Sequence, residues 1–91
     1  MNAPASPALK DLQRIPGVGP AIAADLLGLG IASVDALRGQ DPERLYQRLC
    51  EQAGGHVDRC VLYVFRCAVY FAENTVHDPE RLKWWHWKDR P

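Results

Sequence analysis

Residues that begin and end helices recur along this chain at short intervals, and this punctuation limits what it can fold into. Pro20, Pro42 and Pro79 each follow a residue suited to a helix N-cap, and proline is favoured in a first helical turn because its missing N–H costs nothing there. No stretch alternates apolar and polar residues with the period of two that a strand requires. The sequence therefore predicts an all-α fold, a compact bundle of five to six short helices.

One pentapeptide, Asp-Pro-Glu-Arg-Leu, occurs twice, at residues 41–45 and 78–82. In both copies an Asp cap, a first-turn Pro and a Glu near the positive end of the helix dipole indicate a helix start. We interpret the repeat as shared capping chemistry rather than a duplicated domain. The first copy predicts a helix to about Ala53 that stops at Gly54-Gly55. A long helix over about 57–74 follows, and a last helix begins at Pro79.

Length and composition indicate one small domain. The chain has 91 residues and equal numbers of basic and acidic side chains, which excludes a strongly basic protein that coats nucleic acid. We expect a flexible lead over residues 1–8 and a single domain over 9–89. Arg66 interrupts the longest apolar stretch, so no membrane span is expected. Three cysteines cannot all pair within one chain, which favours a reducing, cytoplasmic location.

The segment around Pro16-Gly17-Val18-Gly19 carries the clearest functional signal. Two short amphipathic segments flank it, the glycines permit a tight reversal, and Val18 can fold back between the helices. The helix that follows begins with unpaired amides and the positive dipole end, a ready site for a phosphate that is read without base sequence. The predicted DNA contacts are Pro16, Gly17, Val18, Gly19 and Ala21, with Lys10 and Arg14 nearby. The alternative is that this hairpin serves only packing.

The motif Ile15-Pro16-Gly17-Val18-Gly19, with Ala23 and Leu26 at the expected offsets, resembles the helix-hairpin-helix family. Residues 58–70 and 82–88 extend the likeness, and the chain is similar to the small bacterial "pathogenicity locus" family, some of whose members are labelled mitomycin-resistance-like. This resemblance implies a helix-hairpin-helix domain with DNA association and no established reaction. A second hairpin would be degenerate, because its loop, Gly39-Gln40-Asp41, lacks the Gly-hydrophobic-Gly pattern and carries an acidic residue.

The long helix carries a polar side with Arg59, Tyr63, Arg66 and Tyr70 at helical spacing. We interpret it as a solvent face with Arg66 paired to Glu73 or Asp58. In the alternative, Arg59 and Arg66 contact nucleic acid. The opposite, apolar side suits the centre of a bundle or a dimer interface.

The only basic segment is C-terminal. Residues 79–91 have a local charge of +2 and contain Trp84, Trp85 and Trp87. We expect Trp84 and Trp87 to pack on the core and Trp85 to be exposed. Lys83, Trp85 and Lys88 are therefore secondary candidates for contact with nucleic acid or with a partner.

The cysteines and histidines form no recognisable metal motif. Cys60 and Cys67 are separated by about 10 Å at 1.5 Å rise per residue, too far for a disulfide or a shared metal. We predict buried, unreactive thiols, no metal and no cofactor. No nucleophile–base motif or phosphate loop indicates an enzyme. The expected function is weak, non-catalytic DNA binding, and the alternative is a protein-interaction or homodimerisation module.

Overall fold

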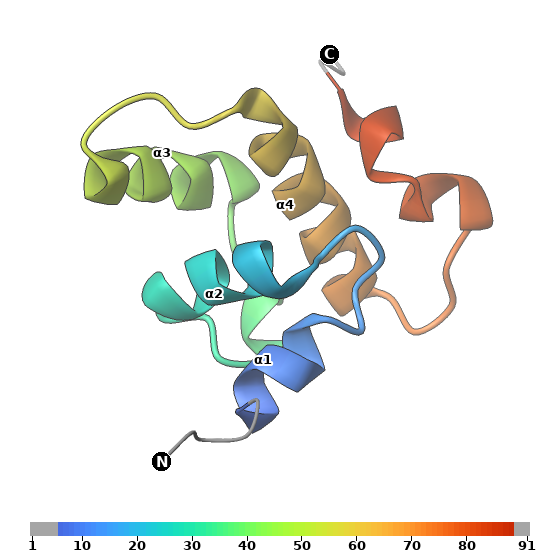
Figure 1. Cartoon of the computed structure of the whole chain (residues 1–91). Coiled ribbons are helices and arrows are strands. Elements are labelled where there is room, and N and C mark those ends of the chain that lie inside the picture. The colour runs from blue at the N-terminus through green and yellow to red at the C-terminus, as the bar shows by residue number, and fades with distance from the viewer. Residues whose placement is uncertain (1–5, 89–91) are drawn as a thin grey trace.

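Helix α4 (Arg59–Glu73) lies at the centre of the structure, between the N-terminal elements and the C-terminal segment (Figure 1). In this computed structural model, residues 6–88 are described. The other elements are α1 (Pro7–Leu12), α2 (Pro20–Gly28), η1 (Asp35–Leu37), α3 (Pro42–Ala53), η2 (Pro79–Leu82) and η3 (Trp84–Trp87), where η denotes a 3₁₀ helix. Helix α4 packs against α3, η1, η2 and η3 and is therefore the element on which most of the others are assembled.

The first helix begins earlier than the predicted start of the domain at residue 9. The Ser6 hydroxyl accepts a hydrogen bond from the Leu9 amide at 3.1 Å and caps α1, so Pro7 and Ala8 belong to this helix. The remainder of the predicted flexible lead, residues 1–5, lies outside the described residues, as does Asp89 at the predicted end of the domain. Helix α2 begins at Pro20, as predicted, and the chain leaves it through Gly30 in the left-handed region (φ +90°).

Both copies of the pentapeptide cap a helical turn, which confirms their interpretation. Asp41 accepts from the Glu43 amide at 3.0 Å and begins α3, and Asp78 accepts from the Glu80 amide at 3.0 Å and begins η2. Helix α3 ends at Ala53, and Gly54 adopts the left-handed conformation (φ +75°) that stops it.

One hydrophobic core joins both halves of the chain. Its largest fully buried apolar side chains come from α1, the loop after it, α2, η1, α3 and α4: Leu12, Ile15, Leu26, Leu37, Leu45 and Phe65. Two polar ties reinforce it: the Asp11 carboxylate accepts from the Val34 amide at 2.7 Å, and Arg48 donates to the Leu29 carbonyl at 2.9 Å. Because these contacts link residues 19–23 positions apart, they fix how α1, α2 and α3 pack together.

The last predicted helix is wrong in form, because the structure contains two separate 3₁₀ turns, η2 and η3. Lys83 between them has an extended backbone (ψ 104°). In an α-helix the Arg81 carbonyl would accept from the Trp85 amide, but here it accepts from the indole N–H of Trp87 at 2.9 Å and from the Cys67 thiol at 3.5 Å. These side-chain donors replace the helical bond, and the Cys67 thiol also links the segment to α4.

The all-α prediction is confirmed for residues 6–88, which contain four α-helices, three 3₁₀ helices and no strand. The predicted five to six helices therefore become four α-helices with single 3₁₀ turns. Within the same residues, no helix has the length and apolar character needed to cross a membrane.

The shared capping chemistry gives a first testable prediction. Asp41→Ala removes the acceptor for the Glu43 amide and should lower the free energy of unfolding by about 1 kcal/mol in chemical denaturation. Asp41→Asn retains an acceptor and should be close to wild type. Asp35→Ala is the matched control, since Asp35 is an exposed first-turn acid whose pair with Arg38 is long at 3.7 Å. Equal losses for Asp41→Ala and Asp35→Ala would contradict the capping role.

Candidate nucleic-acid interface

The loop between α1 and α2 reverses the chain in front of α4 (Figure 1). Gly17 supplies the reversal with φ +89°, a conformation that side chains rarely adopt. Val18 turns inward and is 6% exposed, as predicted, and its amide donates to the Ile15 carbonyl at 3.0 Å. Pro16 has no amide hydrogen. Of the five predicted contacts, Pro16 and Val18 therefore offer no free amide and act by shaping the loop.

Four amides at this loop have no acceptor within residues 6–88: those of Gly17, Gly19, Ala21 and Ile22. The amides of Ala21 and Ile22 belong to the first turn of α2, which always lacks intrahelical acceptors. Ile22 was not among the predicted contacts, although its place in the first turn was readable from the sequence. Open N–H donors at the positive end of a helix dipole suit an anion.

Gly19 is the N-cap of α2 and leaves that end uncovered. It makes no side-chain cap bond, and a Cβ atom at this position would meet nothing within 4 Å. Its backbone is extended (φ −94°, ψ −172°), so any residue can adopt it. A cap residue such as Ser or Asp would satisfy the amides that Gly19 leaves open.

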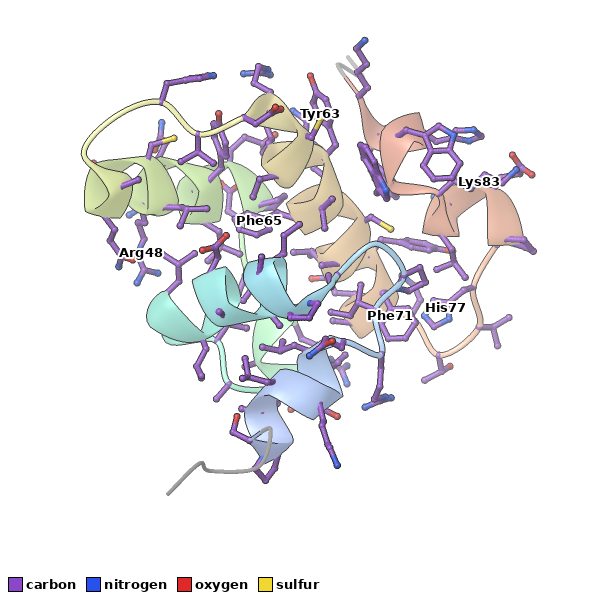
Figure 2. The ribbon with its side chains drawn as sticks, viewed as in Figure 1. Arg48, Tyr63, Phe65, Phe71, His77 and Lys83 are labelled. Carbon is purple, nitrogen blue, oxygen red and sulfur yellow. The ribbon has the colours of Figure 1, made fainter. Side chains whose placement is uncertain are left out.

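Gly17, in contrast, lies directly against the C-terminal segment. A Cβ atom there would stand 2.7 Å from Cδ1 of Trp84, a half-buried ring that packs on the core. This contact brings Trp84 of the C-terminal segment against the loop, a proximity that sequence reasoning missed because the two residues are more than 60 positions apart. Phe71 and His77, which stack at 4.5 Å, lie between α4 and this segment (Figure 2).

The cations predicted at the hairpin differ in how freely they can act. Lys10 is exposed on α1. Arg14 is 62% exposed but pairs with Asp11 at 2.7 Å, which offsets its charge. The bonds that Asp11 accepts from the Val34 amide and from Arg14 hold the pKa of its carboxyl below the usual value. Asp11 therefore remains ionised next to Arg14 at neutral pH and lowers the positive potential near the loop.

The predicted second hairpin loop is closed by the protein's own groups. The Gly39 amide donates to Glu73 at 2.8 Å, and the Gln40 amide donates to the Leu37 carbonyl at 3.1 Å. Asp41 caps α3, as described above. With the Gly39 and Gln40 amides used internally and two carboxylates beside it, this loop suits a phosphate less well than the first loop does.

The predicted solvent face of α4 is wrong for two of its residues. Tyr63 is 6% exposed and the Arg66 side chain only 16%, because η3 packs over this side of the helix. Arg66 pairs neither with Glu73 nor with Asp58: it contacts Glu43 at 2.7 Å and donates to the Trp87 carbonyl at 2.7 Å. Arg59 is exposed, and its Nε lies 3.4 Å from the Tyr63 hydroxyl. Of the two predicted contacts on α4, Arg59 is therefore exposed to a ligand, whereas Arg66 is mostly buried.

The side chains around Arg66 also form a shallow cavity of about 360 Å³ that the sequence did not indicate. It lies between the start of α3, the last turns of α4 and η3. Tyr70 and Trp87 form its aromatic part, and Glu43, Glu73 and Asn74 form its polar part. Because Arg66 already bonds with Glu43 and with the Trp87 carbonyl, it is not available to an anion in this cavity.

The predictions for Trp84 and Trp85 are confirmed, whereas Trp87 packs on Tyr70 rather than on the core cluster. Trp84 packs against the core, Trp87 is half-buried beside Tyr70 with ring centroids 5.6 Å apart, and Trp85 is 54% exposed. Lys83 projects from the C-terminal segment (Figure 2), with its side chain 42% exposed and bonded to Glu80 at 3.0 Å. Lys88 is exposed.

The prediction of buried thiols holds for one cysteine of three. Cys67 is fully buried, and burial raises its pKa to about 11. Cys50 is half-buried and Cys60 is exposed, since Cys60 lies in the first turn of α4 away from the core. A hydrogen bond with Asp58 raises the pKa of the Cys60 thiol and so lowers its reactivity. All three thiols are free, and no group of three potential metal ligands occurs within residues 6–88.

The two glycines of the loop should respond differently to the same substitution. Gly17→Ala places a Cβ atom 2.7 Å from Trp84 at a positive φ and should lower the free energy of unfolding by at least about 1 kcal/mol. Gly19→Ala meets open space at an ordinary φ and should stay within about 0.5 kcal/mol of wild type. Denaturation followed by tryptophan fluorescence measures both. A harmless Gly17→Ala would disprove the contact with Trp84.

Two comparisons with known proteins match this chain. Over 77 residues it is 34% identical to the mitomycin resistance protein McrB of Streptomyces lavendulae, a match that covers 85% of this chain and 70% of that protein. No solved structure matches it. The model of the family described as "Pathogenicity locus" (Cdd1) matches residues 5–91, nearly the whole length, and the chain therefore belongs to this family.

Proposed function

We propose that this protein is a non-catalytic, cytoplasmic DNA-binding module that uses the α1–α2 loop as a helix-hairpin-helix motif. The observation that carries the proposal is the group of unpaired amides at Gly17, Gly19, Ala21 and Ile22. These amides contact a phosphate of the DNA backbone, so binding carries no base sequence specificity.

The surroundings of the loop support an anion more than a purely structural role. Gly19 leaves the start of α2 uncapped, whereas α1, α3 and α4 each have a side-chain cap, from Ser6, Asp41 and Asp58. The contact between Gly17 and Trp84 adds an aromatic side chain to a loop that Lys10 and Arg14 precede in the sequence. Since Asp11 offsets Arg14 and the chain has no net charge, the affinity is weak and depends strongly on salt.

A protein-interaction or homodimerisation module is the alternative. The exposed Trp85 favours it, because tryptophan is enriched at binding hot spots. The apolar side of α4, proposed from sequence as its surface, is buried within this chain, with Val64, Phe65 and Ala68 at most 3% exposed. A partner would therefore bind at the C-terminal segment, and the hairpin would serve only packing.

The DNA-binding proposal predicts that Gly19→Glu abolishes binding. Space is open at this position, so the variant should fold, and its carboxylate would lie among the amides that receive the phosphate. Fluorescence anisotropy of labelled single-stranded, duplex and branched DNA, at low and moderate salt, measures the effect. Wild-type affinity should fall steeply as salt rises.

Gly55→Glu is the matched control for Gly19→Glu. It makes the same charge change at another glycine with open space, in the loop between α3 and α4. It should bind DNA almost as wild type does. If a folded Gly19→Glu protein still binds DNA, the hairpin is not the DNA-binding site. Binding absent from wild type at low salt, together with a mass that rises with concentration in sedimentation, would favour the interaction module.

A second prediction tests the charge beside the loop. Asp11→Asn keeps an oxygen that can accept from the Val34 amide but removes the negative charge paired with Arg14. DNA affinity at low salt should increase several-fold, and the dependence of log affinity on log salt should steepen. The same titrations measure both quantities. Asp35→Asn, which changes the charge equally on η1, should have a smaller effect; equal effects would indicate that only net charge matters.

A further inference from the structure

Trp85 is the one Phe, Tyr or Trp side chain within residues 6–88 that is more than half exposed. Trp84 and Trp87, its neighbours in the same 3₁₀ turn, are half-buried and accounted for by packing on the core and on Tyr70. An indole left in water contributes little to the stability of the fold. Trp85 is therefore an aromatic surface that the fold does not use.

The ring of Trp85 is held by its neighbours. Its centroid lies 5.6 Å from that of Trp84 at 89° and 6.0 Å from that of His86 at 88°. Glu80 also restrains the residues that flank the two rings, since it bonds with Lys83 at 3.0 Å and approaches His86 at 3.6 Å. A ring restrained in this way loses little conformational freedom when a ligand stacks on it.

The position of Trp85 relative to the hairpin defines what such a ligand would be. Trp84 touches Gly17, and the ring of Trp85 contacts that of Trp84 edge-on with centroids 5.6 Å apart, so one aromatic ring separates Trp85 from the loop. A strand whose phosphate sits at the loop amides thus has a nearby base within reach of Trp85.

We propose that Trp85 stacks on an unpaired base of the strand held at the α1–α2 loop, and that the protein's preferred substrate is DNA with single-stranded nucleotides. This inference rests on the proposed function and names its substrate class. In a continuous duplex the base faces are covered by their neighbours, so an indole on the protein surface can stack only where bases are unstacked. Stacking is tolerant of base identity, in keeping with contacts to the backbone alone.

The test uses fluorescence anisotropy with three labelled probes: a single-stranded oligonucleotide, a blunt duplex of the same sequence, and the same single strand with abasic sites replacing its central bases. The abasic strand keeps the phosphates and removes the stacking partner. Wild type should bind the intact strand about tenfold more tightly than the abasic strand. Trp85→Ala should lose this difference while its duplex binding stays unchanged, and Trp85→Phe should retain most of it.

Val76→Ala is the control, since Val76 is an exposed apolar residue (86%) in the turn after α4 and lies outside η3. It should leave all three affinities unchanged. An unchanged ratio of intact to abasic affinity in Trp85→Ala would overturn the stacking inference and leave the hairpin proposal intact. The proposed function itself would be overturned by either of two results. In the first, Gly19→Glu binds every probe as tightly as wild type does. In the second, wild type binds none of the probes.

Discussion

The contact between Trp84 and Gly17 is the interaction on which the candidate interface depends. It joins the first loop of the chain to its last helical turn, across the end of α4. The approach is possible only because Gly17 has no side chain, and the same residue provides the positive φ that turns the loop. Loop shape and the docking of the C-terminal segment are thus one structural requirement. The sequence suggests that Gly17 lacks a side chain so that DNA can approach the backbone. In the structure, its missing side chain leaves room for Trp84.

The two loops that the sequence suggests as hairpins differ in where their amides donate. In the second loop, Glu73 accepts from the Gly39 amide, and Asp41 accepts from the Glu43 amide at the start of α3. In the first, Gly19 has no side chain to do so. Backbone N–H groups require acceptors, and those left open at a protein surface are bonded by water or by a ligand. This contrast within one chain is why the proposed function places the phosphate at the first loop.

The local features of the fold could be predicted from the sequence, because caps and stops act over a few residues. Asp41, Asp78 and Gly54 act as their types indicate. The predictions are wrong where residues distant in the sequence determine the local structure. Arg66 pairs with Glu43, 23 positions away, and is covered by η3, which helical periodicity cannot reveal. The split of the last helix depends on side-chain donors reaching the Arg81 carbonyl. The exposure of Trp85 could be anticipated, since three tryptophans cannot share one face of a short turn, but the contact of its neighbour Trp84 with Gly17 could not.

Net charge is a poor guide to whether this chain can bind an anion. Its basic and acidic side chains balance, and several cations are engaged by carboxylates: Arg14 by Asp11 and Arg66 by Glu43. Amide donors at a helix start need no net charge, because the peptide dipoles supply the positive potential over a short range. Such a site holds one phosphate but does not attract a distant polyanion. Under the proposed function, such a protein gains affinity chiefly from contacts made after the phosphate is in place, and the stacking proposed for Trp85 is a contact of that kind.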